Sequence, residues 1–282
     1  MSAQIEIINP VDGSRMNWLK NEFTESNYDD IENHQHIQKK VSLELILEMG
    51  KGYLDVGANL GDFGIPMALA LKNVGRSDIK VYCIDPDLGK CEFMKEIVKL
   101  NNLDDDSIQI INTGLSDKVG NFSLSHSVVQ DCGTMTGGWQ YLPDENGMEF
   151  TTLDKLWKSG TIGPIGLFNL DAQWAEERIL TGGKEFLTTY RPLILMEYWP
   201  ATGLFADGSV HTAHPGYANT RGRNSTFTER SSHLMNDIQF KKIFDSLGIS
   251  VSKRKFNTEK ITKFGEHPWK EWDILLEFNK IG

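Results

Sequence analysis

The chain has 282 residues, of which 39% are hydrophobic and 24% are charged, and its formal net charge is −10 at pH 7. This length accommodates one large α/β domain or two small ones. Runs of Lys and Arg are short and the net charge is negative, which argues against a nucleic-acid partner, because clustered cations are needed to hold one.

The first residues, Met1 to Ile5, lack the charged and apolar regions of a signal peptide, and no apolar run approaches the length of a membrane span. The cysteines, Cys83, Cys91 and Cys132, are odd in number, and the first two fit the buried faces of a strand and a helix. We therefore expect a soluble cytoplasmic protein with no disulfide framework and no membrane partner.

The N-terminal part, residues 1–49, is predicted to be a helical extension that precedes the main domain, residues 50–282. Residues 1–40 are polar and weakly periodic, and Ser42 is a plausible N-cap for a helix from Leu43 to Glu48. The pair His34 and His36 is interpreted as solvated, because an isolated H-x-H in a polar stretch rarely holds a metal.

A glycine-rich turn follows the first apolar run of the main domain. Tyr53 to Val56 predicts a buried strand, and Ile65 to Leu71 predicts a helix. Between them, Gly57 and Gly61 allow a tight turn and the close approach of a ligand, and the turn leads into a helix N-terminus. The pattern predicts a nucleotide-type site; the alternative is a turn that only packs the helix on the sheet.

The details of this turn favour S-adenosylmethionine over a dinucleotide. Asn59 stands where the dinucleotide fingerprint G-x-G-x-x-G has its second glycine. Asp55 would repel a pyrophosphate, but a carboxylate suits the sulfonium or ammonium group of S-adenosylmethionine. A second strand ends at Asp85, 24 residues after Gly61, where an acid accepts hydrogen bonds from ribose hydroxyls. An NAD-dependent oxidoreductase remains a weaker alternative.

Strands and helices alternate along the next part of the chain. This alternation predicts an α/β fold, a doubly wound and mainly parallel seven-stranded Rossmann-like sheet with an antiparallel edge strand. The predicted helices are Gly64–Lys72 and Leu88–Leu100, a short one from Thr151, and one that ends by Arg191; the predicted strands are Lys80–Ile84, Ser107–Asn112, Asn121–Ser125, Ile165–Leu170 and Leu193–Met196. Residues 133–139 are predicted to be a loop.

Residues 201–232 form a long polar segment rich in Gly, Ser, Thr, Arg and His. A loop of this length is usually a lid or binding loop, or else a mobile insertion, and the sequence leaves both open. An amphipathic helix with Phe240, Phe244 and Leu247 follows. Two strands, Ile249–Phe256 and Ile274–Phe278, are predicted to form an antiparallel pair at the sheet edge.

The order of these motifs resembles the FkbM family of S-adenosylmethionine-dependent methyltransferases, over roughly residues 50–200. The matching runs are Leu54 to Gly61, Ile84-Asp85-Pro86, Gly114 to Asp117 with Gly120, Thr152-Leu153-Asp154, Asn169-Leu170-Asp171, and Arg191-Pro192 before Glu197. The resemblance implies O-methylation of a hydroxyl group on a carbohydrate or small metabolite. The predicted cofactor-binding residues are Asp55, Gly57, Ala58, Asn59, Gly61, Asp85, Pro86, Leu115 and Ser116.

Three candidate catalytic residues follow from the need of a hydroxyl acceptor for a base. Asp171 and Glu197 end neighbouring central strands, at the edge of the sheet where such folds bind ligands, and Asp171 is the first choice. His126, expected in an irregular loop, is a third candidate, although a surface histidine is the commoner interpretation. Asp171, Glu197 and a loop histidine could together hold a metal, which leaves a metal-assisted transferase as an alternative, but no spacing of ligands indicates one and no metal site is predicted.

One run departs from the family pattern. The family typically has K-I-D-x-E-G-x-E at the end of the fourth strand, whereas this chain has Asn169, Gln173 and Trp174 in place of the lysine, one carboxylate and the glycine. This departure motivates an alternative hypothesis, in which the chain binds the cofactor but serves as an interaction protein.

Overall fold

The computed structural model describes residues 3–20, 36–126, 139–172, 175–197, 203–204, 210–211, 244–253 and 273–279. Several residues that the sequence analysis discusses lie outside these ranges: Cys132, Gln173, Trp174 and most of the segment 201–232.

A central sheet of seven strands has the order β14-β15-β11-β10-β3-β4-β5. Five neighbouring strands of it are parallel, which confirms the predicted Rossmann-like core; they are β11 (Leu193–Glu197), β10 (Ile165–Leu170), β3 (Gly52–Val56), β4 (Val81–Asp85) and β5 (Ile108–Asn112). β15 (Asp273–Phe278) runs antiparallel to β11, and β14 (Val251–Lys253) runs antiparallel to β15.

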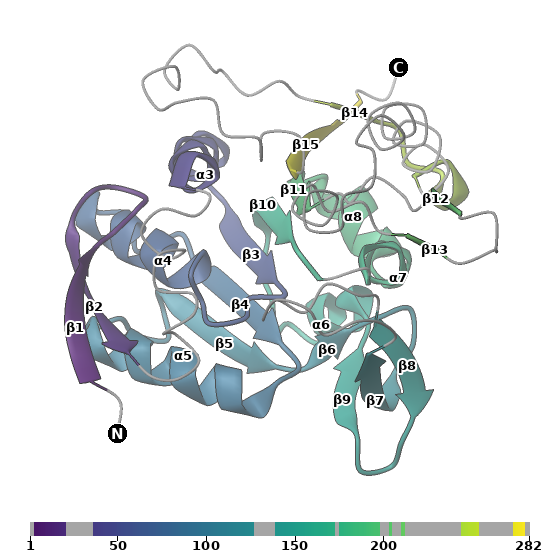
Figure 1. The fold of residues 1–282 in the computed structure, drawn as a ribbon. Coiled ribbons are helices and arrows are strands. Elements are labelled where there is room, and N and C mark those ends of the chain that lie inside the picture. Colours follow the sequence, from purple (N-terminus) through teal and green to yellow (C-terminus); the bar gives the residue numbers. More distant parts are fainter. Residues whose placement is uncertain are drawn as a thin grey trace.

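Helices cover both faces of this sheet, and the inner strands β3, β4 and β10 are buried along their whole length (Figure 1). One face packs against α3 (His36–Met49), α4 (Gly64–Asn73) and α5 (Leu88–Leu100). The other packs against α6 (Leu153–Lys158), α7 (Glu176–Gly182) and α8 (Lys184–Tyr190). Each face of the sheet thus has its own hydrophobic core. Tyr53 of β3 lies in the core on the α3–α5 side and Leu54 in the core on the α6–α8 side, because successive side chains of a strand point to opposite faces.

The N-terminal prediction of helices is wrong for residues 3–20, which form a hairpin of β1 (Ala3–Ile8) and β2 (Arg15–Lys20). The hairpin packs against α5, with the ring centroids of Trp18 and Phe93 6.2 Å apart, and Trp18 belongs to the same core as α4. Its alternation of buried and exposed residues spans too few positions to be evident among polar neighbours. Moreover, α3 begins at His36, so Ser42 lies inside the helix and is not its N-cap.

A smaller sheet projects from the central one, at the lower right of Figure 1. Its order is β6-β9-β7-β8, from β6 (Gly114–Leu115), β9 (Met148–Thr151), β7 (Gly120–His126) and β8 (Trp139–Pro143). β7 confirms the strand predicted around Phe122, whereas β8 and β9 were not predicted. Two short strands, β12 (Gly203–Leu204) and β13 (Val210–His211), form a separate pair. Within the described ranges, no helix has the length and apolar character needed to span a membrane.

Candidate functional site

The glycine-rich turn connects β3 to α4 at the carboxyl edge of the parallel strands. It lies where the strand order reverses, since β4 and β10 flank β3 on opposite sides, and open α/β sheets bind ligands at such a point. The turn uses left-handed backbone at Gly57 (φ 80°), Asn59 (φ 50°) and Gly61 (φ 82°). Asn is one of the few non-glycine residues that adopts this conformation readily, so Asn59 can take a left-handed backbone at the position where the dinucleotide fingerprint has a glycine.

Two glycines of this region allow close packing within the protein. A Cβ on Gly57 would lie 1.7 Å from the carbonyl oxygen of Asp171, and a Cβ on Gly64 would lie 2.1 Å from the Cys83 sulfur. Both distances are far below van der Waals contact. The absence of a side chain therefore lets Gly57 of the turn pack against the backbone that follows β10, and lets Gly64, the first residue of α4, pack against Cys83 of β4.

Most N–H groups of the turn are already bonded inside the protein. Gly57 and Ala58 donate to the carbonyl oxygen of Ile84 at 3.0 and 3.1 Å, and Gly61 donates to that of Ala58 at 2.7 Å. The N–H of Asn59 donates to Asp85 Oδ2 at 2.9 Å. These groups are not free to hold a pyrophosphate, which a dinucleotide site binds through backbone N–H groups.

Asp55 is a buried support of the turn, which corrects the prediction that its carboxylate faces a ligand. Only 1% of the residue is exposed. Its Oδ2 accepts from the N–H of Gly64 at 3.0 Å and its Oδ1 accepts from Asn169 Nδ2 at 2.9 Å. Burial raises the pKa of Asp55 from 3.8 to about 7. The hydrogen bond from Asn169 lowers the pKa, but by less than burial raises it.

Asp85 ends β4, as predicted, and connects two loops. Its Oδ2 accepts from Asn59 and its Oδ1 accepts from the N–H of Asp87 at 2.9 Å. Burial raises the pKa of Asp85, because the carboxylate loses hydration. Asn112, at the end of the neighbouring β5, donates its Nδ2 to the carbonyl oxygens of Asp85 and Pro86 at 3.1 and 3.0 Å.

Two of the predicted catalytic residues end neighbouring strands on the same edge of the sheet as the turn. Asp171 follows β10, is half-buried, and donates its N–H to the carbonyl oxygen of Val56 at 3.0 Å. Glu197 is the last residue of β11, which is parallel to β10. His126 lies elsewhere: it ends β7 of the smaller sheet, opposite Trp139, and is not in an irregular loop as expected.

Leu115 and Ser116, predicted to bind the cofactor, lie at the junction of β6 and α7. Both are buried, and the N–H of Ser116 donates to the carbonyl oxygen of Thr151 at 2.9 Å. A Cβ on Gly182 would lie 2.1 Å from the Ser116 carbonyl oxygen, so α7 packs directly against this segment. The Ser116 hydroxyl donates to Asp117 Oδ1 at 3.0 Å.

Sequence reasoning missed several polar residues that support the turn. Asn112 holds the segment after β4, Asn169 bonds the buried Asp55, and Lys39 of α3 forms an ion pair with Asp62 of the turn at 3.1 Å. The position of Asn112, at the end of the strand that neighbours β4, was a usable signal. The partners of Asn169 and Lys39 depend on how the strands and α3 are arranged in space.

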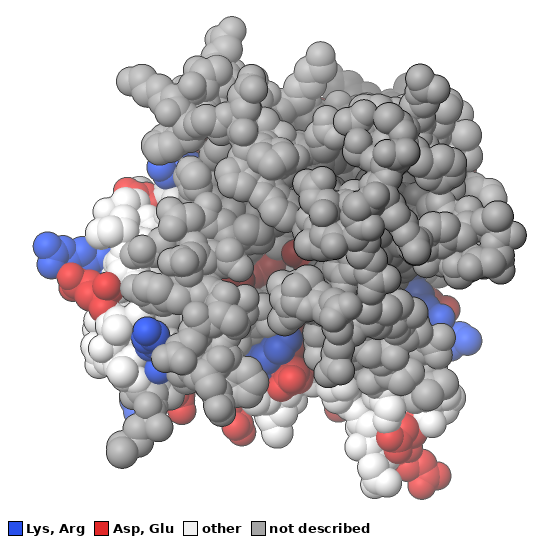
Figure 2. All heavy atoms as spheres, in the orientation of Figure 1, with Lys and Arg blue, Asp and Glu red and all other residues white. Residues whose placement is uncertain are grey.

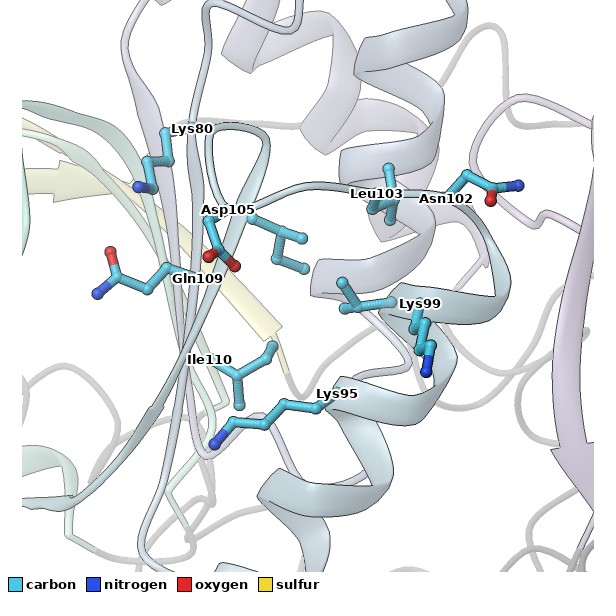
Figure 3. A pocket seen from close by; sticks show the side chains of 10 residues that line it. Lys80, Lys95, Lys99, Asn102, Leu103, Asp105, Gln109 and Ile110 are labelled. Carbon is cyan, nitrogen blue, oxygen red and sulfur yellow. The ribbon is translucent and has the colours of Figure 1, made fainter.

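A cavity of about 700 Å³ lies away from this turn, between α5 and the edge strand β5 (Figure 3). Its lining includes the cationic side chains of Lys80, Lys95 and Lys99 and the apolar side chains of Val98 and Leu103. A smaller cavity of about 250 Å³ adjoins the carboxyl end of β5 and is lined in part by Asn112 and Thr113. None of the predicted site residues lines either cavity.

The charged side chains of the described residues are mixed on the face seen in Figure 2, where Lys and Arg are scattered around the rim. Among the described residues, no group of three or more His, Cys, Asp or Glu side chains is placed to hold a metal ion.

The sequence matches none of the models of known protein families. It is 38% identical over 64 residues to ribosomal RNA small subunit methyltransferase G of Mycobacterium sp. (strain JLS). This matched segment covers 23% of this chain and 26% of that protein. The protein of the same name from Mycolicibacterium smegmatis is 39% identical over 70 residues, or 25% of this chain and 28% of that one. The chain thus spans about a quarter of the length of these curated relatives.

Among solved structures, methyltransferase FkbM from Methylobacillus flagellatus KT has a TM-score of 0.42 and 12% identity, over 92% of this chain and 56% of that chain. A putative caffeoyl-CoA O-methyltransferase from Staphylococcus aureus has a TM-score of 0.46 and 10% identity, over 93% of each chain.

Proposed function

We propose that this protein is an S-adenosylmethionine-dependent methyltransferase. The observation that carries the proposal is the hydrogen bonding of the turn after β3, where the N–H groups of Gly57, Ala58, Asn59 and Gly61 are bonded within the protein. The turn is therefore a poor cradle for the phosphates of a dinucleotide. The short match to two methyltransferases over 64 and 70 residues supports the same conclusion.

Asp85 is the proposed partner of the cofactor's ribose. Each of its oxygens accepts one backbone N–H group. A carboxylate has about four acceptor positions, so Asp85 retains capacity for ribose hydroxyls. The carboxylate of Asp171 would favour the positively charged sulfonium over an anionic ligand, while Gly57, Ala58, Asn59, Gly61 and Pro86 would form the wall of the site.

The proposed reaction is O-methylation of a hydroxyl on a carbohydrate or small metabolite. S-adenosylmethionine would supply the methyl group: the acceptor oxygen would bond to the methyl carbon while the carbon–sulfur bond broke and its electron pair returned to sulfur. The hydroxyl proton passes to a base, for which half-buried Asp171 is the first candidate and Glu197 the second, because Asp171 follows β10, the neighbour of β3, and Glu197 ends β11, the next strand of the sheet. The protein's contribution is to align the acceptor and exclude water.

Calorimetry with S-adenosylhomocysteine, the product of the cofactor, tests the proposal. We expect saturable binding of one molecule per chain in the micromolar range. Titration with NADH, followed by nicotinamide fluorescence, is the matched comparison. Binding of NADH without binding of S-adenosylhomocysteine would reject the methyltransferase in favour of an oxidoreductase.

A second candidate, a cofactor-binding protein without catalysis, is favoured by one contact. Asn169, which replaces the lysine of the FkbM pattern, offers buried Asp55 a neutral amide at 2.9 Å in place of a cation. This candidate predicts binding of S-adenosylhomocysteine but no consumption of S-adenosylmethionine across a broad panel of hydroxyl acceptors. Turnover with any acceptor on the panel would exclude it.

A further inference from the structure

Lys39 of α3 is a buried cation placed against the glycine-rich turn. Its side chain is fully buried, and Nζ lies 3.1 Å from Asp62 Oδ2. The same Nζ lies 4.6 Å from the centroid of the Phe63 ring, where a cation–π interaction adds to the ion pair. Lysine is almost never fully buried without a partner, so this ion pair is a specific feature of the fold.

Asp62 lies in the turn itself, directly after Gly61. Its side chain is 23% exposed, and its charge is among those that raise the pKa of buried Asp55. Lys39 therefore offsets one of several carboxylates that surround the turn. Without that cation, the turn would carry an uncompensated negative charge next to Asp55.

The helix that carries Lys39 is fixed to the sheet independently of this ion pair. At its C-terminal end, the approach to β10 is so close that a Cβ on Gly166 would lie 2.7 Å from Met49 Cβ. The N-terminal hairpin adds a second attachment just beyond the turn, where buried Asn9 Nδ2 donates to the carbonyl oxygen of Pro66 in α4 at 3.0 Å. Two elements that precede β3 thus hold the turn and the start of α4.

We propose that Lys39 is a positioning residue for the cofactor site: through Asp62 it fixes the glycine-rich turn and balances its charge. The segment before β3 is then a working part of the site and not an accessory extension. This inference rests on the proposed function, because the ligand of the turn is taken to be S-adenosylmethionine.

A double-mutant cycle tests the inference, with the variants Lys39→Met, Asp62→Asn and both together. We expect each single variant to weaken S-adenosylhomocysteine binding about tenfold, and the double variant to bind no more weakly than the worse single one, since the two residues act as a unit. Lys158→Met is the matched control: it removes a lysine from an exposed pair with Glu185 (2.7 Å) and should leave the affinity within about twofold.

Amide hydrogen exchange in the ligand-free protein separates this inference from the proposed function. Lys39→Met should speed exchange at residues 57–63 selectively, with no comparable change in α8. If the natural protein binds no S-adenosylhomocysteine, the proposed function fails, and exchange still decides whether Lys39 positions the turn. Unchanged exchange, or effects on affinity that simply add in the double variant, would overturn the inference. If Lys39→Met does not fold, partly exposed Asp62→Asn gives the same readouts.

Discussion

The carbonyl oxygen of Asp171 lies against the α-carbon of Gly57, so that a Cβ at position 57 would stand 1.7 Å from that oxygen. The Asp171 N–H also donates to the carbonyl oxygen of Val56 at 3.0 Å. These contacts join the ends of β3 and β10, the strands between which the chain reverses its order in the sheet. They fix the candidate base Asp171 relative to the turn that we propose binds the cofactor.

Gly57→Ala should destabilise the protein more than Gly75→Ala, and the comparison isolates the effect of the contact. Both glycines have positive φ, 80° and 74°, but no atom lies within 4 Å of a Cβ at position 75. Gly75→Ala should lower the free energy of unfolding by roughly 1 kcal/mol through backbone strain alone. Gly57→Ala should lower it by several kcal/mol, because the new methyl group must displace the backbone that follows β10. Urea unfolding measures both; equal losses would contradict the contact.

Asp55 should make the protein less stable as the pH rises from about 4 to about 7. Burial raises its folded-state pKa from 3.8 to about 7, so in this interval the folded state holds a proton that the unfolded state has lost. The contribution of Asp55 to the free energy of unfolding is fully present below its unfolded-state pKa and is lost as the pH rises through its folded-state pKa. The total contribution is on the order of 4 kcal/mol.

The matched variants for this pH dependence are Asp55→Asn and Asp78→Asn. The free energy of unfolding, measured in urea from pH 4 to pH 8, should fall less steeply for Asp55→Asn than for the natural protein. Asp78 is exposed, and its hydrogen bond with Arg76 lowers its pKa, so Asp78→Asn should leave the slope in this interval unchanged. Parallel slopes for all three proteins would show that Asp55 does not titrate there.

Asp85→Ala should weaken S-adenosylhomocysteine binding by a factor of about 10 to 100, because charge-assisted hydrogen bonds contribute roughly 1.5–3 kcal/mol. The variant also removes the acceptor of the Asn59 N–H. Asp87→Ala is the control: Asp87 caps α5 through the N–H of Lys90, so its loss should cost stability of about 1 kcal/mol but little affinity. Calorimetry and thermal unfolding on the same samples separate the two effects.

Asn9→Ala should destabilise the protein by about 1–3 kcal/mol, because it removes the buried hydrogen bond that Asn9 Nδ2 donates to the carbonyl oxygen of Pro66. Gln4→Ala removes an exposed hydrogen bond to Asn17 within the same hairpin and should cost less than about 0.5 kcal/mol. Chemical denaturation measures both variants. Similar small losses would indicate that the hairpin contributes little to the main core.

The parallel core was predictable because its signals are local. Buried strands such as Ile165–Leu170 are continuous apolar runs, and the helix Leu88–Leu100 has a clear apolar face, so their bounds agree with the structure. The hairpin at residues 3–20 was missed because its short strands expose many polar residues. The strand that begins at Trp139 was likewise missed: residues 133–139 were predicted to be a loop, whereas Trp139 begins a strand that pairs with β7.

The sequence alone determined where the acids of the candidate site occur along the chain, since Asp85, Asp171 and Glu197 each follow or end an apolar run that predicts a buried strand, and the structure has a strand at each. Only the tertiary structure decided what each polar group does. Asp55 is hydrogen-bonded to Asn169, which is 114 residues away in the sequence. Lys39 of α3 is paired with Asp62, in the turn that precedes α4. A buried charge or amide must find its partner in space, and that partner is chosen by the packing of strands and helices, which no local pattern of residues encodes.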